Sequence, residues 1–164
     1  MPNRPSAIAE ELKQSRPFGT SAEEALVSVL RSAAVLRHAL GQQLDPFGIS
    51  MAQYNVLRIL RGAGADGLPT LAVRARLVEE APGITRLIDK LESAKLVRRD
   101  RSGKDRRTVR CQITPAGHEL LAQADEQVRI VQEIVANGLP TESDRIVLVD
   151  LLARLRAAVR STTG

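Results

Sequence analysis

The chain has one cysteine, no tryptophan and only 2% aromatic residues among its 164 positions. A single cysteine excludes an internal disulfide framework, and the scarcity of rings means that the core must be aliphatic. No apolar run approaches the roughly 18 residues of a membrane-spanning helix, and the N-terminal residues lack the apolar segment of a secretory signal. Leu, Ala and Arg are abundant, which favours helices. We therefore expect a cytoplasmic, mainly helical protein.

The sequence also lacks the signatures of catalysis. It has no glycine-rich phosphate loop, no nucleophile elbow and no pair of carboxylates spaced for acid–base chemistry. His38 and His118 lie far apart, without a cysteine or clustered carboxylates nearby, so no metal site is predicted. We expect neither an enzyme nor a bound cofactor.

Positive charge is concentrated in residues 81–110. This stretch holds ten Lys and Arg against four Asp and Glu, a net charge of +6, whereas the whole chain carries +5. The rest of the chain is therefore close to neutral. Such a local patch points to a polyanionic partner; the bland alternative is a solvated run of charge.

The basic stretch begins with an amphipathic helix, predicted from Ala81 with Pro82 in its first turn. Four apolar residues at i, i+3, i+4 and i+7 share one face: Ile84, Leu87, Ile88 and Leu91. The other face carries Thr85, Arg86, Asp89, Lys90 and Ser93. Two strand-like runs follow, 96–99 and 108–113, joined by a charged turn. The pattern predicts a helix followed by a β-ribbon.

Three helices are predicted before this stretch. The first begins near Ser21, where Ser21 and Glu24 fit a capping box. The second follows Ser50, and a short third helix, Leu71–Leu77, is capped by Thr70. Short helices, a tight turn and a ribbon, in this order, predict a winged helix-turn-helix. A helix about 10–12 Å across fits the major groove of DNA.

Two helices are predicted after the ribbon. Thr114 caps a long helix with Pro115 at its first position. Its apolar residues repeat every three or four positions, as in a packed helix pair, and it stops at Gly138. Thr141 begins the last helix. The predicted fold class is mainly α: a winged helix-turn-helix with a two-stranded β wing, plus N- and C-terminal helices.

Six short pieces between residues 49 and 117 occur in an order and spacing that resembles the MarR (multiple antibiotic resistance regulator) family of transcription factors. They are Ile49-Ser50-x-x-Gln53, Leu71-Ala72, Ile84-Thr85-Arg86-Leu87-Ile88-Asp89-Lys90-Leu91-Glu92, Leu96-Val97-x-Arg99, Asp105-Arg106-Arg107 and Ile113-Thr114-Pro115-x-Gly117. The resemblance implies a homodimer that binds double-stranded DNA at a pseudo-palindromic operator, with half-sites about 34–36 Å apart. Such proteins are usually repressors, often released by small aromatic or phenolic acids.

The resemblance, together with Pro2, Pro5 and Pro17 near the N-terminus, implies a division of the chain. We expect a flexible N-terminal arm over 1–19, a dimerisation helix over 20–48, the winged helix-turn-helix over 49–117 and C-terminal dimerisation helices over 118–164. The recognition helix would enter the major groove and the wing the adjacent minor groove.

The candidate DNA contacts lie on the recognition helix and the wing. The helix offers Thr85, Arg86 and Lys90, and the wing offers Arg101, Ser102, Lys104, Arg106 and Arg107. Asp105 is expected to pair with Arg106 or Arg107 and shape the wing. The minor-groove cation is Lys104, or Arg101 if the tip is offset; Lys reads a narrow groove less well than Arg.

Several positions depart from the family pattern. Val78 replaces the usual glycine of the turn, and Glu80 replaces the usual serine cap. Lys95 replaces the glycine between the recognition helix and the wing, so we expect a strained residue with positive φ there. Ser102-Gly103-Lys104 replaces a common Asp-x-Arg.

An effector pocket would lie between the first two helices and the long helix. Its polar candidates are Arg37, His38 and Tyr54, although ordinary surface or core roles also suit them. Cys111 is expected to be a small buried residue rather than a redox sensor. The competing function is a winged-helix module whose basic patch docks an acidic protein partner.

Overall fold

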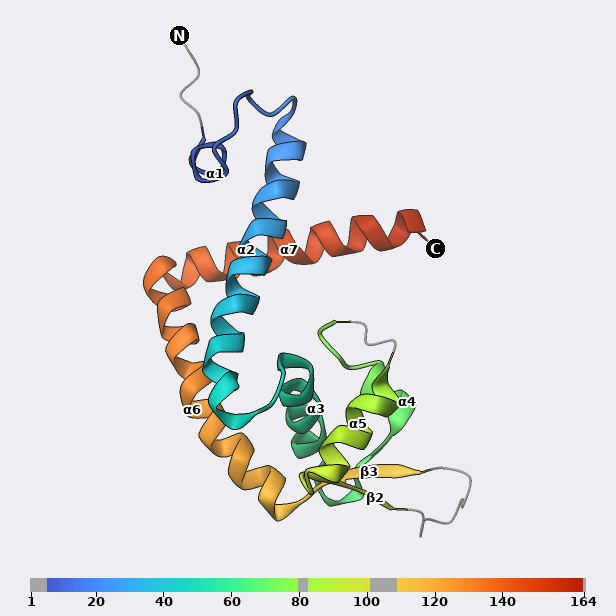
Figure 1. The fold of residues 1–164 in the computed structure, drawn as a ribbon. Coiled ribbons are helices and arrows are strands. Elements are labelled where there is room, and N and C mark those ends of the chain that lie inside the picture. The colour runs from blue at the N-terminus through green and yellow to red at the C-terminus, as the bar shows by residue number, and fades with distance from the viewer. Residues whose placement is uncertain (1–5, 80–82, 101–108, 164) are drawn as a thin grey trace. The chain divides into compact units, whose positions relative to one another are not determined.

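The computed structural model describes residues 6–79, 83–100 and 109–163 (Figure 1). The chain forms two compact units, Met1–Met51 and Ala52–Gly164. Most described residues are helical, with one small antiparallel sheet. The predicted fold class, a mainly helical winged helix-turn-helix protein, is confirmed. The four-part division by function stays a prediction.

The first unit contains α1 (Ala7–Glu11), α2 (Ser21–Leu44) and the single-turn helix η1 (Asp45–Phe47). An ion pair of 2.7 Å between Arg31 Nε and Glu11 Oε1 joins α1 to α2. The N-cap of α2 is Thr20, whose hydroxyl accepts a hydrogen bond from the Glu23 amide at 3.1 Å. The predicted Ser21 cap is therefore wrong by one residue, since Thr20 and Glu23 have the same spacing.

The second unit is built around α3 (Met51–Gly62), α4 (Thr70–Arg74), α5 (Ile84–Ser93) and a three-stranded sheet, with the single turn η2 (Gly64–Asp66) between α3 and the first strand. The strands are β1 (Leu68–Pro69), β2 (Val97–Asp100) and β3 (Arg110–Ile113), in the antiparallel order β1-β3-β2. Fully buried aliphatic side chains of the three helices form the core: Val56, Leu57, Leu60, Val73, Ile88 and Leu91.

Residue Thr70 lies within α4 rather than capping it, and Pro69 takes the cap position. The helix also ends at Arg74, short of the predicted Leu77. Because β1 pairs with β3, opposing Leu68 to Cys111, the Thr70 hydroxyl faces the sheet and lies 3.6 Å from Cys111 Sγ. The third predicted helix is present, but its cap and length were wrong.

The turn from α5 into β2 closes with a left-handed residue. The Leu96 amide donates to the Leu91 carbonyl at 2.9 Å, and the Lys95 amide donates to Glu92 at 2.8 Å. These two bonds define a Schellman motif, whose αL residue is usually glycine. Here it is Lys95, with φ of 61°. The predicted positive φ at Lys95 is confirmed.

The start of α6 (Pro115–Gly138) is fixed against this turn. The Thr114 hydroxyl donates to the Lys95 carbonyl at 2.7 Å and accepts from the Gly117 amide at 3.0 Å. A Cβ on Gly117 would lie 2.2 Å from the Leu96 carbonyl oxygen. Only glycine permits this approach, so the predicted Thr114 cap also joins α6 to the base of the wing.

The two C-terminal helices differ in burial. The predicted apolar seam of α6 is buried over Leu121, Ala124, Val128 and Val131. In contrast, α7 (Glu142–Thr163) has no buried side chain among residues 142–162, whose exposure the structure describes. Its exposed large apolar side chains are Ile146, Val147, Leu148, Val149, Leu151, Leu155 and Val159. Along residues 6–79, 83–100 and 109–163, no helix is both long and apolar enough to cross a membrane.

Candidate nucleic-acid interface

The face of α5 that is not buried carries the predicted DNA contacts. Ile84, Ile88 and Leu91 are at most 6% exposed, whereas Thr85, Arg86 and Lys90 are all exposed. The predicted amphipathic pattern is confirmed, with Leu87 only half-buried. The helix begins at Ile84, with Gly83 as its cap, and not at Ala81 as predicted. Glycine is costly inside a helix, which accounts for the later start.

The turn before α5 is held by α3. The Val78 amide donates a hydrogen bond of 3.1 Å to Asn55 Oδ1, while the Val78 side chain is 77% exposed. A side chain of α3 therefore fixes the backbone at the position where the family usually has glycine. Glu80 lies outside the described residues.

Arginine 99, on β2, spans the gap to α5. Its Nη1 donates to Glu92 Oε2 at 2.5 Å and its Nη2 to Asp89 Oδ1 at 2.6 Å. Burial acts to lower the pKa of Arg99, but the hydrogen bonds with Asp89 and Glu92 outweigh it, and the pKa lies above its ordinary value. This cation is therefore bonded to carboxylates of the protein itself.

A second cation of the basic stretch, Arg110 on β3, has an internal role as well. Its Nε donates to the Asp66 carbonyl at 2.7 Å and its Nη2 to the Gly67 carbonyl at 2.9 Å. The neighbouring Gln112 donates to the Ala65 carbonyl at 2.7 Å. These bonds fasten η2 to the sheet. Arg99 and Arg110 belong to the basic stretch of the sequence, and neither of these internal roles was predicted.

The wing tip falls in residues 101–108, outside the described residues. The predictions for Arg101, Ser102, Lys104, Asp105, Arg106 and Arg107 all concern this segment and stay predictions. The ribbon that leads to it is present, with Asp100 opposite Arg110 in the register of β2 and β3.

The three predicted effector residues belong to different units. Arg37 and His38 are exposed on α2, in the first unit. Tyr54 is only 2% exposed, on α3 in the second unit, and its hydroxyl donates to Asp125 Oδ1 at 2.7 Å. Their proposed role in binding a ligand stays a prediction, but the Tyr54 hydroxyl already has a partner.

The pair of Tyr54 and Asp125 links α3 to α6. Arg61 Nη1 also donates to Asp125, at 2.5 Å, and the Arg58 guanidinium lies 5.7 Å from the centre of the Tyr54 ring. Burial and the hydrogen bond to Asp125 raise the pKa of Tyr54 to about 12. Burial acts to raise the pKa of Asp125, but the bonds from Tyr54 and Arg61 outweigh it and leave that pKa below its ordinary value.

Cysteine 111 lies on β3 and is fully buried. It is paired in the sheet with Arg99 on one side and Leu68 on the other. The prediction of a small buried residue is confirmed.

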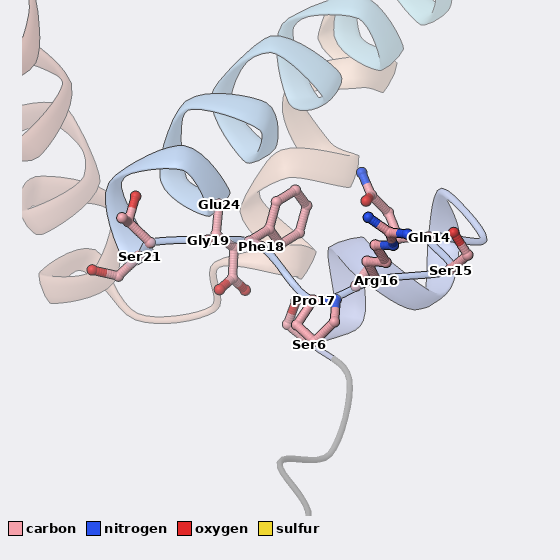
Figure 2. Close-up of a pocket in the computed structure, with 11 residues that line it drawn as sticks. Ser6, Gln14, Ser15, Arg16, Pro17, Phe18, Gly19, Ser21 and Glu24 are labelled. Atoms are coloured by element: carbon pink, nitrogen blue, oxygen red, sulfur yellow. The ribbon is translucent and has the colours of Figure 1, made fainter.

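A cleft of about 480 Å³ lies in the first unit, between α1, the loop after it and the first turn of α2 (Figure 2). Its lining includes Arg16, Phe18 and Glu24. One cation and one anion give no consistent preference for the charge of a ligand. We assign no function to this cleft.

The chain is similar to known transcription regulators. Residues 49–109 match the MarR family model. The chain is 30% identical over 123 residues to the HTH-type transcriptional regulator FarR of Neisseria gonorrhoeae, covering 73% of this chain and 82% of FarR. It is 29% identical over 110 residues to the Bacillus subtilis HTH-type regulator YdgJ, covering 66% of this chain and 65% of YdgJ, just under two thirds of that protein.

Solved structures share the fold. A MarR transcription factor from Planctomyces limnophilus is 33% identical, with a TM-score of 0.64 over 84% of this chain and 98% of that one. The S. aureus MepR–DNA complex is 20% identical, with a TM-score of 0.71 over 86% and 98%. Bordetella bronchiseptica BpsR, whose DNA binding is regulated by 6-hydroxynicotinic acid, is 22% identical, with a TM-score of 0.70 over 82% and 99%. The chain belongs to the MarR family of DNA-binding transcription regulators.

Proposed function

We propose that this regulator is a homodimer that represses transcription from a pseudo-palindromic operator until a small aromatic or phenolic acid releases it. The observation that carries the proposal is the arrangement of α5, whose apolar face is buried while Thr85, Arg86 and Lys90 remain exposed. A helix held in this way presents its polar face to the base edges of a major groove.

On α5, the residues have different tasks. Arg86, in the first turn, is suited to the bidentate contact that arginine makes with guanine. Lys90, one turn later, is suited to a phosphate, and Thr85 lies beside Arg86. At the wing tip, Lys104 or Arg101 is our candidate for the minor groove, and Arg106 or Arg107 for phosphate.

The exposed apolar side chains support a second copy as partner. Leu26 and Leu30 on α2 are 55% and 60% exposed, and Leu148 and Leu155 on α7 are 40% and 42% exposed. Soluble proteins seldom leave so many large aliphatic residues in water unless they cover a partner. We assign residues 20–48 and 118–164 to dimerisation and 49–117 to DNA.

The proposal of an aromatic acid effector draws on BpsR, whose DNA binding responds to 6-hydroxynicotinic acid. In this chain Arg37 and His38 offer exposed polar groups on α2. Tyr54 stays a predicted effector residue, although its hydroxyl is bonded to Asp125 and its side chain is only 2% exposed.

A binding titration on the DNA upstream of the encoding gene tests the proposal. A dimer that contacts about 6–10 phosphates loses some 10³–10⁵-fold in affinity between about 50 and 200 mM salt. Arg86→Ala should weaken binding by about 1–3 kcal/mol and relax specificity. Arg16→Ala is the charge-matched control, because Arg16 is exposed before α2, outside the residues assigned to DNA binding and to dimerisation.

Two outcomes would count against the proposal. A flat response to salt without sequence preference would favour the alternative, a basic patch that docks an acidic protein. A solution mass equal to one chain of 17.8 kDa at micromolar concentration would refute the dimer.

A further inference from the structure

The guanidinium of Arg99 makes contacts along two turns of α5. In addition to its bonds with Asp89 and Glu92, Nη2 lies 3.5 Å from the Thr85 carbonyl oxygen, in the first turn. The Arg99 amide also donates to Glu92 Oε1 at 3.1 Å. One residue of β2 therefore bonds with α5 through both its backbone and its side chain.

The two carboxylates that bond to Arg99 are more exposed than Arg99 itself, so their charge would act on bound DNA. The Arg99 side chain is 19% exposed, whereas Asp89 and Glu92 are 53% and 39% exposed. These two carboxylates lie on the same helix as Arg86 and Lys90. Without a cation beside them, they would face the phosphates of bound DNA with like charge.

We propose that Arg99 is the positioning residue of the recognition helix: it fixes the angle between α5 and the wing and neutralises Asp89 and Glu92. The inference rests on the proposed DNA-binding role of α5. Arg99 itself does not touch DNA. It acts through Arg86 and Lys90, whose reach into the groove depends on the orientation of α5.

Arginine suits this task better than lysine does. A guanidinium is planar and presents donors in a fixed fork, so one side chain holds two carboxylates and a carbonyl at once. An ammonium is a point charge and leaves the angle of the helix less well defined. Arg99→Lys therefore keeps the charge and removes the geometry.

The experiment compares two affinities of each variant. One is for a duplex that carries the operator from the DNA upstream of the encoding gene, and the other is for a shuffled duplex of the same length and composition. In Arg99→Lys, affinity for the shuffled duplex should stay within about twofold, and preference for the operator should fall about tenfold, the scale of one lost base contact. Arg98→Lys is the matched control. Arg98 is the exposed neighbour on β2, and its replacement should leave the preference unchanged.

Asp89→Asn gives a second, independent readout. It removes a negative charge from α5, so electrostatics alone predicts tighter binding to both duplexes. If Arg99 positions the helix, the variant should bind the shuffled duplex more tightly and yet prefer the operator less. Circular dichroism and solution mass establish that each variant is folded and assembled like the wild type.

The outcomes separate the inference from the function on which it rests. If the wild type does not prefer the operator, the proposed function fails and the inference fails with it. If the wild type prefers the operator, and Arg99→Lys and Asp89→Asn prefer it as strongly as the wild type does, the positioning role alone is refuted.

Discussion

Replacing Tyr54 by Phe removes one hydroxyl from the contact between α3 and α6. The hydroxyl donates to Asp125 Oδ1 at 2.7 Å, and the tyrosine is only 2% exposed. The phenylalanine ring fills the same space, so the change concerns the hydrogen bond rather than packing. It therefore measures how strongly α3 is fastened to α6 by this pair.

The expected loss at neutral pH follows from the chemistry of the pair. A hydrogen bond to a charged group contributes about 1.5–3 kcal/mol. Asp125 keeps its bond to Arg61, and its side chain is 32% exposed. Water can therefore replace part of the hydrogen bond that Asp125 Oδ1 loses. We expect the free energy of unfolding to fall by about 1–2 kcal/mol.

The difference between wild type and variant should depend on pH on both sides of neutrality. The pKa of Tyr54 is about 12 in the fold and about 10 in the unfolded chain. The native state therefore holds the proton more tightly, and stability is lost as pH rises from the unfolded pKa towards the folded one. By pH 11 the loss amounts to about 1.4 kcal/mol, which removes most of the advantage over Tyr54→Phe.

On the acid side the sign is opposite. The pKa of Asp125 lies below its ordinary value in the fold, so its contribution is present above the unfolded pKa, near 4. It is lost as pH falls through the folded pKa. The stability difference between wild type and Tyr54→Phe should therefore form a plateau from about pH 5 to 9 and decline at both ends.

Urea denaturation at fixed protein concentration, followed by circular dichroism at pH 3 to 11, measures this profile. Fixed concentration matters because a proposed dimer unfolds with a concentration-dependent midpoint. Arg58→Lys is the control, because it keeps a cation near the ring and leaves the hydroxyl in place. A difference between wild type and Tyr54→Phe that is constant up to pH 11 would refute the reasoning from the Tyr54–Asp125 bond.

Two further substitutions test the junction between α5, the wing and α6. Lys95→Gly should remove the steric strain of an αL side chain, about 1–2 kcal/mol, and add about 0.5–1 kcal/mol of chain entropy to be lost on folding. Thermal unfolding should therefore show a net stabilisation of about 0.5–1 kcal/mol. An equal gain in Lys95→Ala would argue against strain as the cause. Gly117→Ala should destabilise by about 1–3 kcal/mol in urea, because its Cβ would lie 2.2 Å from the Leu96 carbonyl oxygen. Gly62→Ala is the control, because a Cβ on Gly62 would meet no neighbouring atom within 4 Å. A similar loss of stability in that variant would contradict the steric explanation.

Local patterns predicted the elements that depend on local rules. The burial of Ile84, Ile88 and Leu91 follows from helical periodicity. The Thr114 cap follows from the preference for a hydroxyl that accepts a hydrogen bond from a free amide in the first turn of a helix. The Thr20 cap was placed one residue too late because Ser21 and Glu24 offer the same spacing. A rule with two adjacent solutions does not choose between them.

Contacts between distant residues had no such signal. Tyr54 and Asp125 are 71 residues apart, and neither position differs locally from an ordinary helix residue. Likewise, the charge count treats Arg98 and Arg99 alike. Side chains alternate along β2, so Arg99 lies on the face of the buried Val97 and Arg98 on the exposed face. The charge count does not contain the position of α5, which supplies the two carboxylates that bond to Arg99. The basic patch was therefore predicted, but the intramolecular bonds of Arg99 and Arg110 were not.

The close contact of Gly117 with Leu96 turns α6 into a lever. The helix has 24 residues and is about 36 Å long. With no room for a Cβ and with Thr114 bonded to the Lys95 carbonyl, the first turn of α6 and the base of the wing form one closely packed body. A tilt of about 5° about the far end of α6 displaces that body by about 3 Å, close to the spacing of about 3.4 Å between successive bases. A few degrees at one end of this helix are thus equivalent to one base step at the other.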